Sequence, residues 1–411
     1  MKIAIIIWKL DISGGGQRQA LELAYNLQKK SHQVDVFCCY LNKEKCYPNI
    51  INKLNVYVIS SEDLERTLKK KLSFSKKIIS KIKNYSLDAE NILLVNLIQK
   101  RNKTVKYDVF NYHDSKVFMI APFFEKEKNF WMMNDLPSIL DIKQRNNLFR
   151  KTGHGIKSIF KKIVLVNKFI NTEINLNLYV RYIGKVMVLD ERNKNLAKRY
   201  FFKNSTVIRS GIDIEKFKVS KKQYNLDNKI NLLSTSIFFP HRRYEDTIEA
   251  LNILINNHKI TNLHFNIVGE SKTDPEYYSY IQSLVQKYSL KKDISFLGSV
   301  SDEKLAQLYK NSDIFIFPNT NQTWGLAVFE AMLSGCVAIV SNGCGAHEVL
   351  TNKQNAIIVK EKSSNEIAIA IKHLITNKKE MEKIGENGQS FVKDNLSWDK
   401  YTDEMLKIFR S

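Results

Sequence analysis

The sequence predicts an α/β protein with two doubly wound parallel sheets, and three observations support this class. Short apolar runs typical of buried strands alternate with helical patterns along the whole chain. A length of 411 residues suits two domains of this kind. Lys and Arg outnumber Asp and Glu by 38 to 18 in residues 1–205 but only by 26 to 24 in residues 206–411, so the two halves differ in charge.

The first half begins with an almost entirely apolar run, Lys2–Trp8, which we expect to form a strand buried on both faces. A glycine-rich turn and a helical pattern over Gln17–Lys30 follow it. Similar apolar runs predict six further strands: Gln33–Cys39, Asn55–Ile59, Asp108–Tyr112, Phe130–Met133, Lys185–Leu189 and Ser205–Ile208.

The second half repeats the alternation. Its predicted strands are Ile230–Thr235, His264–Val268, Ile294–Leu297, Ile314–Phe317 and Val337–Val340. Its predicted helices are Glu245–Asn256, Glu276–Tyr288, Asp302–Lys310, Leu326–Ser334 and Glu366–Thr376. No low-complexity linker interrupts the chain, so we expect a tight hinge near residues 200–212, between a domain over 1–204 and a domain over 205–392.

Composition excludes several classes of protein. The five cysteines are odd in number and form no Cys-x-x-Cys pair, which argues against a disulfide framework or a thiolate zinc site and favours a reducing cytosol. The apolar segment Ile3–Trp8 is too short for a signal peptide, and no stretch approaches the ~18 apolar residues of a membrane span. We therefore expect a cytoplasmic protein whose only contact with a membrane is peripheral.

Two stretches, Leu64–Lys83 and Gly155–Ile174, hold much of the surplus positive charge. Both combine lysines with apolar residues at helical spacing, as in helices that lie on an anionic membrane surface. Both also fit a helix packed on the core with a solvated lysine face. The charge surplus favours a surface role for Leu64–Lys83, whereas the wider apolar circumference of Gly155–Ile174 favours ordinary core.

The turn after the first strand, Ser13–Arg18, contains three consecutive glycines before a helix. Glycine lets the backbone approach a ligand closely, and a helix N-terminus offers free N–H groups and partial positive charge, a combination that binds phosphate. The turn is neither G-x-G-x-x-G nor a Walker loop, and a plain tight turn accounts for it equally well.

Residues 312–350 hold the densest group of candidate residues. A buried strand ends at Pro318, a polar loop runs to Gly325, and a short helix follows. A second strand leads to the turn at residues 343–345, which we expect to begin another helix. Both helix N-termini should lie at one sheet edge, where Glu330 could accept hydrogen bonds from a ribose diol. Taken alone, a glutamate on a helix is more often a solvated surface residue.

This stretch resembles the donor-site signature of glycosyltransferase family 4, the retaining enzymes of the GT-B fold. The family has a Glu, seven residues and a second Glu followed by Ala-Met, and here Gln322 and Glu330 occupy the two positions. Around residues 15–60 and 131–134 the chain most resembles mannosyltransferases that extend polyprenol-diphosphate-linked oligosaccharides. Further segments are similar in the family's order: Gly14–Arg18, Ile208–Asp213, Asn266–Gly269, Phe296–Gly298 and Leu396–Trp398.

The resemblance implies two Rossmann-like domains facing across a cleft, the N-terminal one binding the acceptor and the second binding the donor. It also implies that residues 393–411 form a helix that crosses back to the first domain. The implied reaction transfers a sugar from a nucleoside-diphosphate sugar, of UDP or GDP type, with retention of configuration and with no metal or other cofactor.

Without a metal, protein groups must neutralise the donor diphosphate. In the resemblance, Arg242 stands at the family's Lys position. Ile237 holds the place of the family's Arg, and Arg243 substitutes for it. We expect Arg242 and Arg243 to stabilise the charge that grows on the leaving phosphate, and which of them does more is open.

The remaining donor residues also come from the resemblance. Glu330 matches the Glu implied to bind the ribose hydroxyls. Gln322 replaces the Glu that contacts the donor sugar and supports the cationic transition state, so it keeps a hydrogen bond but loses the charge. The amides of Trp324, Gly325 and Leu326 are implied to face the donor sugar and phosphate.

In the first domain, His113 follows a strand and matches the family's cleft histidine, implied to bind the donor sugar or shape the reaction centre. A purely structural histidine fits equally well. Gly15 and Gly16 are expected to let the donor phosphate or the acceptor approach. Glu348 fits the family's carboxylate in the second loop, and His347 has no assigned role.

Four functions compete. The first is a retaining hexosyltransferase, with mannose as one candidate sugar, whose lipid-linked or membrane-surface glycan acceptor would explain the basic first half. The second is a weakly catalytic sugar-nucleotide binding protein or partner subunit, which Gln322 supports. A nucleic-acid-binding protein suits the net charge of +22, but the sequence has no helix-turn-helix, zinc or RNP signature, so we expect no specific nucleic acid partner. An epimerase would need further carboxylates in the cleft.

Overall fold

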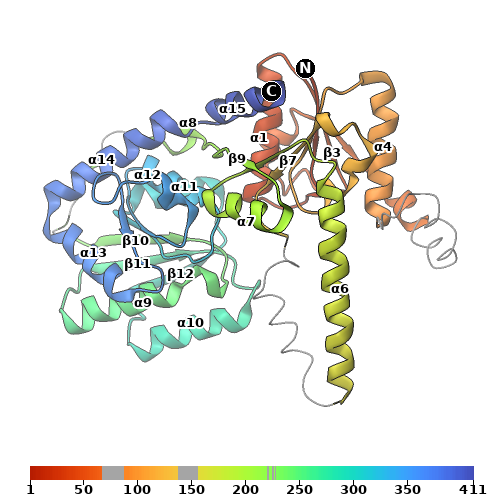
Figure 1. Ribbon diagram of the computed structural model, residues 1–411. Helices are drawn as coiled ribbons and strands as arrows, with labels where there is room; N and C mark the ends of the chain where they lie inside the picture. The colour runs from red at the N-terminus through yellow and green to blue at the C-terminus, as the bar shows by residue number, and fades with distance from the viewer. Residues whose placement is uncertain (67–87, 138–155, 220–221, 225, 227) are drawn as a thin grey trace. The chain divides into compact units, whose positions relative to one another are not determined.

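The computed structural model describes residues 1–411 apart from 67–87, 138–155, 220–221, 225 and 227 (Figure 1). The chain divides into two compact units. The first unit comprises Met1–Arg209 with Tyr401–Ser411, and the second unit comprises Ser210–Lys400. Each unit has its own parallel sheet and its own hydrophobic core, which confirms an α/β protein with two doubly wound sheets.

The first unit contains a seven-stranded sheet in the order β5-β3-β1-β6-β7-β8-β9, in which every neighbouring pair is parallel. β1 is buried after its first residue because helices cover both faces of such a sheet. β2 and β4 form a separate two-stranded pair. The strands are β1 (Lys2–Ile6), β2 (Lys9–Leu10), β3 (Gln33–Cys38), β4 (Tyr40–Leu41), β5 (Asn55–Val58), β6 (Val109–Tyr112), β7 (Asn129–Met133), β8 (Lys185–Val188) and β9 (Ser205–Val207).

Helices cover both faces of this sheet. They are α1 (Gly15–Lys29), α2 (Pro48–Ile51), α4 (Ala89–Val105), η1 (Val117–Phe123), η2 (Lys126–Lys128), α6 (Ile156–Val180), α7 (Glu191–Phe201) and α15 (Trp398–Arg410). Figure 1 shows α4 and α6 on the side of the sheet away from α1. From residue 401 onward α15 belongs to the first unit, where Asp403 pairs with Lys30 at 2.9 Å and the ring of Phe409 lies 5.1 Å from that of Phe130.

The second unit contains a six-stranded parallel sheet in the order β12-β11-β10-β13-β14-β15. Its strands are β10 (Ile230–Thr235), β11 (Leu263–Val268), β12 (Ile294–Gly298), β13 (Ile314–Phe317), β14 (Val337–Ser341) and β15 (Ile357–Val359). Its helices are α8 (Ile214–Phe217), η4 (Pro240–Arg242), α9 (Tyr244–Asn252), η5 (Ile253–Asn257), α10 (Pro275–Lys287), α11 (Asp302–Asn311), α12 (Leu326–Leu333), η6 (Gly345–Val349), α13 (Ser364–Thr376) and α14 (Lys378–Asn395). α9 packs with α10 and α13, whereas α12 packs with α11 and α14.

Every strand expected from the sequence is present, with ends that differ by at most two residues. β15 was not expected because three residues give too little pattern, and α4 was missed because its apolar residues are consecutive over residues 92–95 rather than helically spaced. Two expectations were wrong in detail. The turn at residues 343–345 leads only to η6, a five-residue 3₁₀ turn, and the helix expected over Glu245–Asn256 changes to the π-helical turn η5 after Asn252.

The expectation that Gly155–Ile174 packs as ordinary core was wrong. On one side of α6, Leu176 belongs to the core of the first unit and Phe169 is also buried. A second apolar side, which includes Ile159 and Ile170, remains exposed because the helix packs through one face only. Most of the other basic stretch, Leu64–Lys83, lies outside the described residues.

Candidate functional site

Both sheets have a place where the strand order reverses, between β1 and β6 in the first unit and between β10 and β13 in the second. In doubly wound sheets the loops that follow such strands diverge from each other and leave room for a ligand at the carboxyl edge. In the first unit, Gly15 and Gly16 begin α1, the first helix after β1, and His113 directly follows β6. The loops after β10 and β13 contain Arg242 and Gln322, so most of the sequence-predicted residues lie at these two places.

In the second unit, backbone hydrogen bonds fix three loops to one another. The amide of Thr320, after β13, donates to the carbonyl of His241, after β10, at 2.8 Å. The amide of Gln322 donates to the carbonyl of Gly343, after β14, at 3.2 Å, and the amide of Gly345 donates back to the carbonyl of Gln322 at 2.9 Å. These bonds give the sheet edge a defined surface without any ligand.

Arg242 lies at the centre of this surface. Its guanidinium donates to the side-chain oxygen of Gln322. The amide of Asn319, oriented so that both of its ends are satisfied, accepts from the same guanidinium at 3.0 Å and donates to the Arg242 carbonyl at 3.1 Å. Two neutral amides therefore orient the Arg242 guanidinium. Sequence reasoning missed Asn319, although a polar residue directly after a buried strand could have indicated it.

Arg243, the other predicted phosphate-binding residue, has carboxylate partners of its own. Its guanidinium contacts Glu245 at 2.7 Å and forms two bonds to Asp246, at 2.9 and 2.5 Å. Its backbone is left-handed, with φ of 56°, and precedes α9. The structure thus engages Arg243 at the start of α9, and Arg242 is the better placed cation for a ligand.

The N-terminus of α12 follows Gly325, whose φ is +80°. A Cβ atom at this glycine would lie 3.0 Å from both Cys344 Sγ and a ring carbon of Phe317, so a side chain would be both strained and crowded. The first turn of an α-helix has N–H groups without helical partners, and at α12 this turn includes Leu326. The turn therefore offers amide donors and partial positive charge beside the loop of Gln322.

Trp324 is a structural anchor through its side chain. Trp324 is 2% exposed, its ring centroid lies 4.5 Å from that of Phe329, and its Nε1 donates to the carbonyl of Ser210 at 3.0 Å. Only its backbone could take the donor-facing role implied by the resemblance.

Glu330 is buried on α12 and is 8% exposed. Tyr309 on α11 donates its hydroxyl to Glu330 Oε2 at 3.3 Å, and the same hydroxyl lies 2.9 Å from Oγ1 of Thr235, the last residue of β10. Burial raises the pKa of Tyr309, and the neighbouring Glu330 carboxylate adds to that shift, so the phenol remains a donor. A surface residue would not be held in this way. The sequence offered no signal for Tyr309.

His347 and Glu348 lie in η6, after β14. Nδ1 of His347 lies 2.7 Å from the carbonyl oxygen of Cys344, so Nδ1 donates to that carbonyl. Glu348 is partly exposed on the same turn.

In the first unit, His113 is 1% exposed directly after β6. Its Nε2 lies 2.7 Å from the side-chain oxygen of Asn111, which assigns the proton to Nε2. Its Nδ1 is buried and has no hydrogen-bond partner among the described residues. Burial lowers the pKa of His113 to about 3, so the ring is a neutral acceptor at ordinary pH.

The glycine-rich turn of the first unit leads directly into α1, which starts at Gly15. A Cβ atom at Gly16 would lie 3.5 Å from the amide nitrogen of Asn134, after β7, and that amide also donates to the carbonyl of His113 at 3.4 Å. Asn134, a residue for which sequence reasoning assigned no separate role, therefore lies beside Gly16 and bonds to the backbone of His113.

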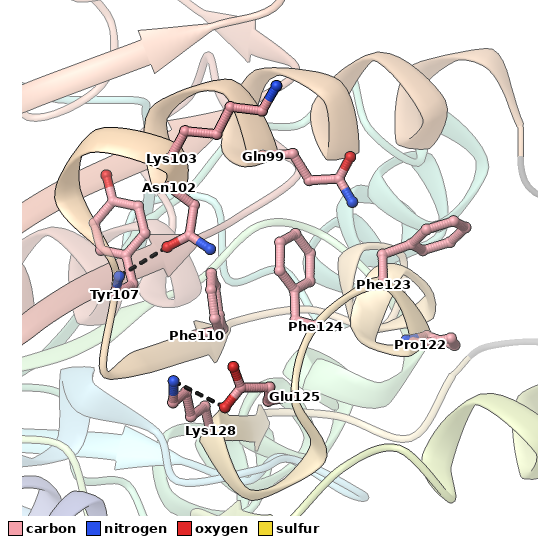
Figure 2. A pocket seen from close by; sticks show the side chains of 10 residues that line it. All are labelled: Gln99, Asn102, Lys103, Tyr107, Phe110, Pro122, Phe123, Phe124, Glu125 and Lys128. Carbon is pink, nitrogen blue, oxygen red and sulfur yellow. Dashed lines mark hydrogen bonds and ion pairs between the residues drawn. The ribbon is translucent and has the colours of Figure 1, made fainter.

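A separate hollow of about 560 Å³ lies at the opposite edge of the first sheet. Figure 2 shows its wall of aromatic rings, among them Phe110 and Phe124, with Lys103 and the Lys128–Glu125 ion pair at its rim. Tyr107 and Lys128 precede β6 and β7, so the hollow is at the amino ends of the strands. It includes none of the predicted site residues.

Two absences concern the described part of the chain. Within it, no group of three or more His, Cys, Asp or Glu residues is arranged to hold a metal ion. No described helix is long and apolar enough to cross a membrane.

A comparison with protein families gives a match within the second unit. Residues 216–391 match the family model for glycosyl transferases group 1. Among curated proteins, the uncharacterized glycosyltransferases MJ1607 and MJ1069 of Methanocaldococcus jannaschii are 27% and 30% identical over 32% and 56% of this chain. These matches span only 34% and 61% of the relatives' own lengths.

A longer match covers 80% of this chain and 81% of the UDP-Gal:alpha-D-GlcNAc-diphosphoundecaprenol alpha-1,3-galactosyltransferase of Escherichia coli, at 23% identity. The crystal structure of Anabaena Alr3699/HepE in complex with UDP and glucose covers 100% of both chains with a TM-score of 0.73 and 15% identity. That likeness confirms the GT-B fold. The comparisons thus give a glycosyl transferases group 1 match for most of the second unit and the GT-B fold for the whole chain.

Proposed function

We propose that this protein is a retaining hexosyltransferase. It transfers a sugar from a nucleoside-diphosphate sugar to a lipid-linked or membrane-surface glycan acceptor, at the cytoplasmic face of the membrane. One observation supports this most directly: Arg242, oriented by Gln322 and Asn319, lies at the reversal of strand order in the unit that matches the glycosyl transferases group 1 model.

The chemistry follows from the residues. When the bond between the sugar and the β-phosphate breaks, negative charge grows on the leaving nucleoside diphosphate. Arg242 and the amides at the start of α12 would stabilise that charge, and they need no reorganisation to do so. Glu330, held by Tyr309, would accept hydrogen bonds from the ribose hydroxyls. The first unit would carry the acceptor, with His113 as a neutral hydrogen-bond acceptor.

The donor is of UDP or GDP type in this proposal. UDP is the first nucleotide to test, because UDP is named for both the Escherichia coli relative and the HepE complex. GDP-mannose is the second, because shorter matches include the O-antigen chain mannosyltransferase RfbU of Salmonella typhimurium, 28% identical over 48% of this chain. No metal is assigned to the site.

A thermal-shift panel of UDP, GDP, ADP and CMP with their sugar conjugates tests the donor site. A ligand at ~100 times its Kd adds ~2.7 kcal/mol to stability. We expect a shift for one nucleotide, lost in Glu330→Ala and retained in Glu303→Ala, a control at an exposed glutamate of the same unit. No shift with any nucleotide would contradict the proposal.

A second candidate function is supported by Gln322, whose side chain accepts a hydrogen bond from Arg242 where the family has a carboxylate. A protein that binds the donor but turns it over weakly would have this feature. Gln322→Glu tests it: a weak enzyme should turn over faster in the variant, whereas an enzyme adapted to glutamine should slow down while its donor affinity stays similar.

A further inference from the structure

α6 has an unusual concentration of exposed apolar side chains. In the described part of the chain, fourteen large apolar side chains are exposed, and seven of them lie on this helix. Phe160 is 69% exposed and Ile159 is 58% exposed, which is unusual for residues of this size. The seven are Ile159, Phe160, Ile163, Val164, Val166, Ile170 and Ile174.

These residues form one continuous strip. The spacing Ile159, Ile163, Val166, Ile170 and Ile174 repeats at intervals of four and three, which places them in a row along one side of a helix. Phe160 and Val164 widen the row near the N-terminal end. The row spans about 22 Å at 1.5 Å per residue. Its members differ from the buried side of α6, which includes Phe169 and Leu176.

The charges on α6 suit an anionic partner. Residues 156–172 contain four lysines and no Asp or Glu, and the first acidic residue is Glu173. Lys161 and Lys162 occur within the apolar row's span, and residues 1–205 as a whole have a surplus of twenty positive charges. Four lysines in this short segment make it costly to bury the helix across a bilayer, but favourable to place it at the headgroup level.

We infer that α6 inserts its exposed apolar strip, the seven residues named above, into the surface of a membrane containing anionic lipids. A second copy of this chain fits less well, because pairing two such strips would bring their lysines together. The inference deepens the proposed function, in which the acceptor lies at a membrane, but it concerns a different part of the molecule from the donor site.

Flotation with phospholipid vesicles tests the inference. The full-length protein should float with vesicles of phosphatidylglycerol and phosphatidylcholine, and bind phosphatidylcholine alone much more weakly. Phe160→Ser combined with Ile163→Ser should reduce binding at least about tenfold, because both side chains lose apolar area that the bilayer would cover. Ile369→Ser is the matched control, since Ile369 is 68% exposed on α13 of the second unit, and it should change nothing.

A second variant places a probe at the same position. In Phe160→Trp, the new indole should be quenched by brominated phosphatidylglycerol, over and above the signal of the wild-type protein. An unchanged midpoint of urea unfolding shows that each variant is folded. Wild-type protein that stays unbound, a double variant that binds as well as wild type, or a dimer that the double variant converts to monomer would overturn the inference. None of these results depends on donor turnover, so this inference and the proposed function can fail separately.

Discussion

In the second unit, the loops after β10 and β13 present a guanidinium and two amides at the reversal of strand order. At the equivalent place in the first unit, the loops after β1 and β6 present three glycines and a buried, neutral imidazole. The two sheets have the same order around their first strands, so topology alone does not separate them. The fold therefore supplies two equivalent places for ligands, and the side chains at each place determine which of them can hold a diphosphate.

The largest effect expected from a difference between the two units is on turnover by the enzyme. Arg242→Ala should lower kcat with the nucleotide-sugar donor by about 10²–10³-fold, because it removes a positioned cation from the leaving phosphate. Steady-state and single-turnover kinetics measure the loss. If the variant keeps its activity, the assignment of diphosphate chemistry to the second unit is wrong.

Arg243→Ala is the control for that variant. Since Arg243 pairs with the buried Glu245 and Asp246, its removal should lower the stability of the second unit by about 1–3 kcal/mol and affect donor affinity less than Arg242→Ala does. The opposite ranking would make Arg243 the phosphate-binding residue.

The glycines of the two loops should also differ. Gly325→Ala should cost about 1–3 kcal/mol in unfolding free energy, since its φ is +80° and its Cβ would crowd Cys344 and Phe317. Gly16→Ala should have a small effect, because its Cβ meets only an ordinary contact at 3.5 Å. Urea unfolding measures both.

Gly298→Ala separates backbone strain from side-chain crowding as causes of the stability loss expected in Gly325→Ala. Its φ is +65°, but nothing lies within 4 Å of its Cβ, so it reports backbone strain alone. If Gly298→Ala and Gly325→Ala lower the free energy of unfolding equally, crowding at the α12 N-terminus does not contribute to the loss.

His113 should make the first unit sensitive to acid. Its pKa of about 3 in the folded protein is below the ordinary value of 6.5, so the unfolded chain binds more protons between these values and stability falls as pH decreases below about 6.5. From pH 7 to pH 5 this contribution is about 2 kcal/mol. Denaturant unfolding of His113→Gln should lack that part of the pH dependence. An identical pH profile in both proteins would mean that His113 is not held neutral by burial.

The smallest effect concerns the ribose. Glu330→Gln should weaken nucleotide binding about tenfold, because a neutral amide accepts more weakly than a carboxylate. Tyr309→Phe removes the hydroxyl bonded to Glu330 and should weaken binding by less than that. Isothermal titration calorimetry with the preferred nucleotide measures both. A larger loss in Tyr309→Phe would indicate that the phenol itself contacts the ligand.

The sequence by itself determined the alternation of strands and helices, the two-sheet class and the loops that would hold chemistry, because apolar periodicity and glycine positions are local properties of the chain. Only the tertiary structure decided what each candidate side chain contacts. It engaged Arg243 with two carboxylates, placed Arg242 against the side-chain amides of Gln322 and Asn319, and buried His113. It also showed that the apolar pattern of α6 is only partly used for packing. Periodicity shows how apolar the surface of a helix is, whereas the tertiary packing determines which faces of that helix are covered.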